Sequence, residues 1–137
     1  MMLFGGRLKE IASADPAAGA EISITVPDNK RWLIISLSFS LVTDATVANR
    51  NVNVIAKNTG GNVVFRSGSN INHTASTTKV YGFAAIGDEG EGLGVTHIMA
   101  PTILVLDEGM KLETATANLQ AADNFGIAYG LALEIDI

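Results

Sequence analysis

The chain has 137 residues, of which 47% are apolar and 17% are charged, a composition that excludes a disordered protein and predicts one compact domain. Its formal charge of −5 disfavours binding to nucleic acid, because that function needs a basic patch. The absence of cysteine excludes disulfides, thiolate metal sites and a cysteine nucleophile.

The first 18 residues differ from the rest and form an N-terminal arm, ahead of a domain predicted over residues 19–137. The apolar side chains of the arm recur at a spacing that fits a short helix: Leu3, Phe4, Leu8, Ile11 and Ala12. A helix this short is marginal in water, so the arm either covers its own domain or frays, or it docks on a neighbouring subunit. The chain shows no signal-peptide pattern and no run near the roughly 20 apolar residues of a membrane helix. We therefore expect a soluble protein with no membrane partner.

From Glu21 onward the apolar residues alternate, which is the period of a half-buried strand. A turn at Pro27 leads into the longest alternating run, residues 30–43. One side of this run is predicted to carry Leu33, Ile35, Leu37, Phe39 and Leu41. The other side carries Trp32 and Ile34, followed by Ser36, Ser38 and Ser40.

Further strands are predicted between turn residues, over 52–56, 63–66, 71–77, 79–86, 95–99, 102–106, 110–116 and 127–137. Residues 58–62 join the first two of these as a hairpin. The last run alternates large apolar side chains with a small-residue side, which lets another backbone approach closely: Ala128, Gly130 and Ala132. Together the runs predict an all-β fold, an antiparallel, jelly-roll-like β-sandwich of about eight strands with a short N-terminal arm.

Residues that carry catalysis or bind metals are sparse. His73 and His97 have no close partner of the kind that zinc sites use, and no Gly-x-Ser-x-Gly elbow occurs. Most acids lie in predicted turns, although strands can bring distant carboxylates together for glycoside hydrolysis. The acidic loop 87–94 either binds calcium or is only solvated. The sequence thus predicts a protein that is not an enzyme and has no cofactor, with ion binding by the loop left open.

Two residues of the predicted strands suggest contact with another subunit. Trp32 either caps the end of the sandwich or lies at an intersubunit contact, where aromatic residues are enriched. Arg50 has no adjacent acid, so its planar fork suits a carboxylate from another loop or subunit, unless it is an ordinary surface arginine. With the arm included, the predicted partner-binding residues are Leu3, Phe4, Arg7, Leu8, Trp32, Ile34 and Arg50.

Four segments resemble small β-sandwich virion proteins encoded among the structural genes of tailed phages. They are Arg31-Trp32-x-Ile34 at the start of a long strand, and residues 46–52, 106–112 and 118–123. The resemblance implies a capsid decoration (cement) or head–tail subunit that forms a homo-oligomer, with a trimer favoured. It implies binding to the major capsid protein or another virion protein, and location in the virion after assembly in the host cytoplasm.

The composition read alone agrees with such a role, since low charge and a mean hydropathy of +0.30 indicate surface that is buried against another protein. Two alternatives come from other classes. The first is a carbohydrate- or receptor-binding sandwich of a phage tail or head fibre, although one Trp and two Tyr provide few aromatic rings on which a sugar could stack. The second is a small cupin-like enzyme with a transition metal.

Overall fold

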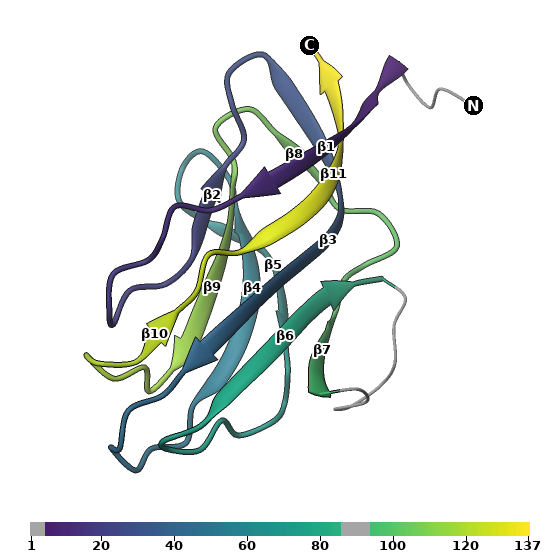
Figure 1. Cartoon of the computed structure of the whole chain (residues 1–137). Helices are drawn as coiled ribbons and strands as arrows, with labels where there is room; N and C mark the ends of the chain where they lie inside the picture. The colour runs from purple at the N-terminus through teal and green to yellow at the C-terminus, as the bar shows by residue number, and fades with distance from the viewer. Residues whose placement is uncertain (1–4, 86–93) are drawn as a thin grey trace.

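The computed structural model describes residues 5–85 and 94–137 of the chain. Its strands form two stacked sheets (Figure 1), which confirms the predicted all-β sandwich. The described residues form eleven strands where about eight were expected. The larger sheet has the order β1-β11-β3-β6-β7, with β8 and β10 also paired to β3, and the smaller sheet has the order β2-β9-β4-β5. The strands are β1 Arg7–Ala12, β2 Ser23–Thr25, β3 Lys30–Val42, β4 Asn51–Lys57, β5 Val63–Gly68, β6 Thr78–Ala84, β7 Val95–Met99, β8 Val105–Asp107, β9 Lys111–Ala117, β10 Asn124–Phe125 and β11 Tyr129–Asp136.

The long strand β3 is the spine of the larger sheet. It pairs with β11 and β10 along one edge and with β6 and β8 along the other. These pairings are antiparallel, whereas β6 and β7 pair in parallel. In the smaller sheet, β4 and β5 form the predicted antiparallel hairpin. Because side chains alternate along a strand, β3 contributes both to the core and to the outer surface of its sheet.

A β-bulge in β3 decides which side chains face the core. Ile34 pairs with Ala132, but Ser36 pairs with Leu131, so Ile35 is an extra residue. One extra residue reverses the in–out alternation of a strand. The predicted placement of Leu33 and Ile35 on the same side as Leu37, Phe39 and Leu41 is therefore wrong. Ahead of the bulge the buried side chains are Trp32 and Ile34, and beyond it they are Leu37, Phe39 and Leu41.

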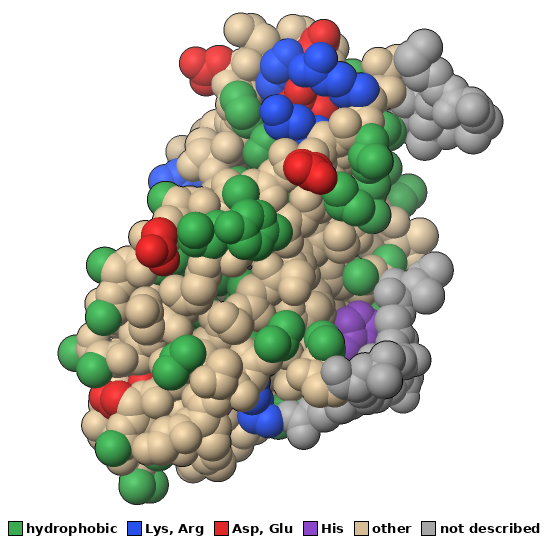
Figure 2. All heavy atoms as spheres, viewed as in Figure 1, with side chains coloured by type: hydrophobic (Ala, Val, Ile, Leu, Met, Phe, Trp, Pro, Cys, Tyr) green, Lys and Arg blue, Asp and Glu red, His purple; other side chains and the backbone are tan. Residues whose placement is uncertain are grey.

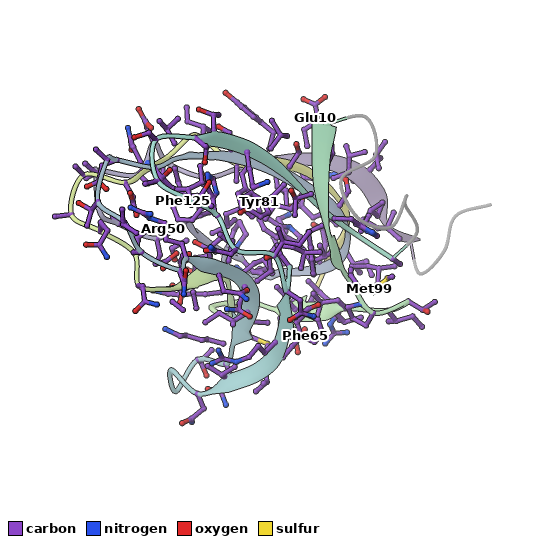
Figure 3. All side chains as sticks on the ribbon, turned by 90° about the horizontal axis from the view of Figure 1, so that it is seen from below. Glu10, Arg50, Phe65, Tyr81, Met99 and Phe125 are labelled. Atoms are coloured by element: carbon purple, nitrogen blue, oxygen red, sulfur yellow. The ribbon has the colours of Figure 1, made fainter. Side chains whose placement is uncertain are left out.

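The core lies between the two sheets and combines aliphatic residues with a small aromatic group. Phe39 stacks on Tyr81 with ring centroids 5.4 Å apart, and Phe125 meets Phe39 edge-on at 5.8 Å. Figure 3 shows Tyr81 and Phe125 in the interior, with Arg50 beside them. From the smaller sheet, the same core cluster includes Val52, Val54 and Leu112, which are fully buried.

The expected helix in the N-terminal arm is wrong. Residues 7–12 form β1, which pairs with β11 from Arg7 opposite Glu134 to Ala12 opposite Tyr129. The free edge of β11 offers backbone hydrogen bonds that a short isolated helix cannot match. Leu3 and Phe4 lie outside the described residues.

The expected strand over 71–77 is also wrong. Only an isolated bridge joins His73 to Arg50 there, because Asn70 and Ser76 adopt positive φ angles that interrupt a strand. The acidic loop predicted at 87–94 lies outside the described residues apart from Gly94.

Candidate functional site

The outer face of the larger sheet carries a continuous aliphatic row. Leu8 of β1 pairs with Leu133 of β11, Leu133 pairs with Leu33 of β3, and Leu33 pairs with Val105 of β8. Four neighbouring strands thus present aliphatic side chains side by side on one surface. Leu8 is 66% exposed and Val105 is 46% exposed, so no other part of the described chain covers the ends of this row.

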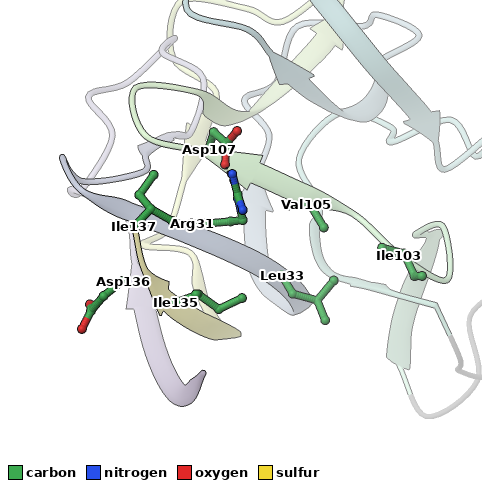
Figure 4. A pocket seen from close by; sticks show the side chains of 8 residues that line it. All are labelled: Arg31, Leu33, Ile103, Val105, Asp107, Ile135, Asp136 and Ile137. Carbon is green, nitrogen blue, oxygen red and sulfur yellow. Dashed lines mark hydrogen bonds and ion pairs between the residues drawn. The ribbon is translucent and has the colours of Figure 1, made fainter. Parts of the chain in front are cut away.

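A groove of about 760 Å³ deepens one end of that face (Figure 4). Its floor and walls are mainly aliphatic, from Leu33, Ile103, Val105, Ile135 and Ile137. Ile103 is 69% exposed and Ile137 is 50% exposed. Unlike the polar outer face that is usual for an antiparallel sandwich, this surface remains apolar to its margin. We use the name apolar face for the row and groove together: Leu8, Leu33, Ile103, Val105, Leu133, Ile135 and Ile137.

Ion pairs within the chain border the apolar face at the end of the sandwich where the groove lies. Arg31 binds Asp107 across β3 and β8, and Lys30 binds Asp136 across β3 and β11. The Lys30 hydrogen bond lowers the pKa of Asp136 below its ordinary value. In Figure 2, Lys or Arg side chains and Asp or Glu side chains gather at the top of the molecule, with hydrophobic side chains spread below them.

A third ion pair ties the edge strand β1 to the sheet. Glu134 is buried and accepts hydrogen bonds from Trp32 Nε1 at 2.9 Å and from Arg7 Nη2 at 2.8 Å. The Trp32 indole and then the Arg7 guanidinium hold the pKa of Glu134 below its ordinary value. Two of the predicted site residues, Arg7 and Trp32, therefore bind the Glu134 carboxylate of their own chain. Leu8, next to Arg7, lies on the apolar face.

Three of the predicted site residues lie inside the fold. Trp32 is 4% exposed and Ile34 is 6% exposed, because the bulge in β3 turns them inward. Arg50 is fully buried, and its guanidinium binds Asp123 through two hydrogen bonds of 2.6 and 3.0 Å and Asp44 through one of 2.8 Å. The guanidinium of Arg50 thus binds a carboxylate from another loop, which is one of the partners that the sequence suggested. These three side chains offer no surface to a partner in the folded chain.

Arg50 belongs to a buried polar cluster at the opposite end of the sandwich. Burial by itself raises the pKa of Asp123, but hydrogen bonds from Arg50 and from the backbone of Gln120 and Asp44 outweigh it and hold the pKa low. Nearby, the His73 ring contacts the Tyr81 hydroxyl at 2.9 Å and the Thr77 carbonyl at 3.2 Å. Burial lowers the pKa of His73.

Every buried side-chain polar atom of the described residues has a hydrogen-bond partner, so this cluster is satisfied within the chain. Within residues 5–85 and 94–137, no three His, Asp or Glu side chains gather closely enough to hold a metal ion. The same ranges contain no helix long and apolar enough to cross a bilayer.

Sequence reasoning missed the residues of β11 and β8 that form the apolar face. The alternation of β11 was recognised, but its large side chains face outward, while Ala128 and Ala132 are fully buried. The predicted close approach of a backbone is confirmed at Gly130, where a Cβ atom would lie 2.2 Å from the Ser36 carbonyl oxygen. The small side chains of Ala128 and Ala132 were the signal in the sequence that this side faces inward.

No protein-family model matches the sequence, and no curated protein matches it. Similar solved structures include infectious bursal disease virus, Gt strain, at 16% identity and a TM-score of 0.40, over 96% of this chain and 33% of that one. They also include a mutant VP2 protein of the same virus in T=1 particles, at 15% identity and a TM-score of 0.42, over 96% of this chain and 32% of that one. An arabinose-bound α-L-arabinofuranosidase matches at 9% identity and a TM-score of 0.42, over 92% of this chain and 19% of that one. The chain spans about a third of the viral chains, and likeness at this level assigns it no function.

Proposed function

We propose that this chain is a non-enzymatic structural subunit of a virion, a capsid decoration protein that self-associates and binds the capsid lattice. The observation that carries the proposal is the apolar face of the larger sheet. In a sandwich the inner face of each sheet is buried by the other sheet, and the outer face is ordinarily polar. Aliphatic side chains on four neighbouring outer strands are suited to burial against another protein.

The apolar face has the features of a protein-binding surface. Its centre is aliphatic, and charged groups lie at its margin, as in interfaces with an apolar core and a polar rim. Leu8 extends it onto β1, so we propose that the segment from Leu3 to Leu8, including Phe4 and Arg7, adds to the contact. The resemblance to tailed-phage virion proteins supports a partner within a virus particle, assembled in the host cytoplasm.

Self-association is tested by measuring molar mass with light scattering after size exclusion, at several protein concentrations. The double variant Leu33→Thr/Val105→Thr places β-branched residues, which suit strands, at both positions but makes the apolar face polar. The matched control is Val63→Thr/Val64→Thr on β5, where the two valines are 44% and 55% exposed. We expect the native chain and the control to form one oligomer of closed symmetry and the face variant to shift toward the monomer.

Particle binding is tested by co-sedimentation with capsids of the phage that encodes the chain. The native protein and the β5 control are expected to pellet with capsids at a saturating stoichiometry, and the face variant is expected to bind less. A chain that remains monomeric at every concentration and never pellets with capsids would contradict the proposed function.

One observation favours a second function, carbohydrate binding. Tyr129 is 61% exposed and lies beside Glu10 and Ser36 in a shallow hollow of about 340 Å³. An exposed aromatic ring next to a carboxylate and a hydroxyl suits stacking on a sugar with hydrogen bonds to its hydroxyls. A glycan array in which a reproducible hit disappears in the Tyr129→Ala variant would favour this function over the first.

A further inference from the structure

We infer that the apolar face is covered by the same face of a second copy of this chain, with the two larger sheets stacked about a two-fold axis. The inference rests on the proposed function and names the partner and the symmetry of its contact. Three properties of the face support it: its area, its charge and its shape.

The area is sufficient for a specific contact. The strands β1, β11 and β3 lie side by side over positions 129–134, and β8 widens the face beside Arg31–Leu33. At about 4.8 Å per strand and about 3.3 Å per residue, these strands cover roughly 400 Å² in projection, including polar positions at the margin. Protruding side chains make the accessible area larger than the projection, so two such faces together reach the roughly 1,000 Å² that a specific interface requires. In such a pair, the apolar face of each copy would be buried against the apolar face of the other.

The charges also favour a second copy. The chain carries a net charge of −5, which repels copies of itself in most orientations. At the groove end of the apolar face, however, three cations are already bound to acids of their own chain, in the pairs Arg7–Glu134, Lys30–Asp136 and Arg31–Asp107. Each pair is neutral, so this part of the margin offers no excess charge to a strongly basic or acidic partner. The same neutral pairs on a second copy can approach it without like-charge repulsion.

The shape of the face favours two-fold over three-fold symmetry. Two sheet faces can stack over their whole area, as the two sheets of any β-sandwich do, and a patch that meets itself does so about a two-fold axis. Three such faces around a three-fold axis enclose a prism and touch mainly along their margins. The geometry thus points to paired copies, in place of the trimer that the sequence resemblance favoured.

Because the chain lacks cysteine, single engineered cysteines can test this arrangement. A two-fold axis brings a position near it against its own copy, and a disulfide forms when the two Cβ atoms come within about 3.8 Å. We would compare Leu8→Cys, Leu33→Cys, Leu133→Cys and Val105→Cys, which sample the aliphatic row. Val64→Cys on β5, 55% exposed, is the matched control.

Under mild oxidation one position of the row is expected to give at least tenfold more disulfide-linked dimer than Val64→Cys, with yields that fall along the row away from it. Circular dichroism of each reduced variant verifies the fold, and the four separate positions guard against one that does not fold. The inference is overturned if no position of the row exceeds the control.

The molar mass of the native chain separates failure of the inference from failure of the proposed function. An oligomer without cross-links along the row overturns the two-fold contact but leaves self-association standing. A monomer that pellets with capsids overturns the second copy and makes the capsid protein the partner of the face. A monomer that does neither overturns both proposals.

Discussion

The two ends of the sandwich reverse the usual distribution of residue types. At one end Arg50, Asp123 and His73 are buried at 1% exposure or less, and their polar atoms find partners within the chain. At the other end aliphatic side chains such as Leu8 and Ile103 are more than 60% exposed. The buried charges are satisfied by the fold itself, whereas the exposed aliphatic residues have no covering element in the described chain. The buried polar cluster therefore serves the stability of the fold, whereas the exposed aliphatic residues are available to a partner.

The largest expected effect is at the buried end. Arg50→Ala would leave Asp123 buried without its cation, and breaking a buried ion pair in this way costs about 3–5 kcal/mol of the free energy of unfolding. Urea unfolding measures the loss. Arg66→Ala, at an exposed arginine of β5, is the control and is expected to change stability by less than about 0.5 kcal/mol. Equal losses in the two variants would refute the structural role of the Arg50 cluster.

The next effect compares two leucines of β3 that lie on opposite faces because of the bulge. Leu37 is 2% exposed, so Leu37→Ala is expected to lower the free energy of unfolding by about 2–5 kcal/mol. Leu33 lies on the apolar face, so Leu33→Ala is expected to cost about 1 kcal/mol or less in dilute solution. The same Leu33 variant should reduce the molar mass measured at high concentration. If Leu33→Ala unfolds the chain as Leu37→Ala does, Leu33 belongs to the core.

The third effect is a pH dependence that comes from the buried end. Burial lowers the pKa of His73, and the nearby charges of Lys79 and Arg50 lower it further, while Thr77 and Asp123 oppose the shift. Between the folded pKa and the ordinary pKa of 6.5, the unfolded chain binds more protons than the folded one. Stability is therefore expected to fall as the pH drops below about 6.5 and through the folded pKa.

Urea unfolding between pH 7.5 and pH 5 checks this dependence. The variant His73→Gln is expected to have a flatter profile over that range, and His97→Gln serves as the control that retains it. A profile of His73→Gln as steep as that of the native chain would assign the dependence to other groups.

The smallest effect is local and lies beside the apolar face. Arg7→Gln removes the cation that holds β1 to Glu134, while the Trp32 hydrogen bond to the same carboxylate remains. Amide hydrogen exchange is expected to accelerate a few-fold in β1 and to stay unchanged in β3 and β4, because an edge strand opens locally. Arg66→Gln is the matched control, and unchanged exchange in β1 would show that its backbone pairing alone holds the strand.

The fold class and several elements could be predicted from the sequence alone. Period-two alternation identified β3 and β11, and the turn at 58–62 identified the β4–β5 hairpin, because strand pattern and turn chemistry are local properties. The small residues Ala128, Gly130 and Ala132 also predicted a close approach, which the contact of Gly130 with Ser36 realises.

Other features were decided only by the tertiary structure. Alternation defines two faces of a strand, but which face is buried depends on the sheet that packs on it, and one bulged residue in β3 exchanged the faces around Leu33 and Ile35. The arm formed a strand because the edge of β11 was available to it. Arg50 found its principal acid, Asp123, 73 residues away. Sequence patterns record local periodicity, while burial and pairing arise from segments that meet only when the chain has folded.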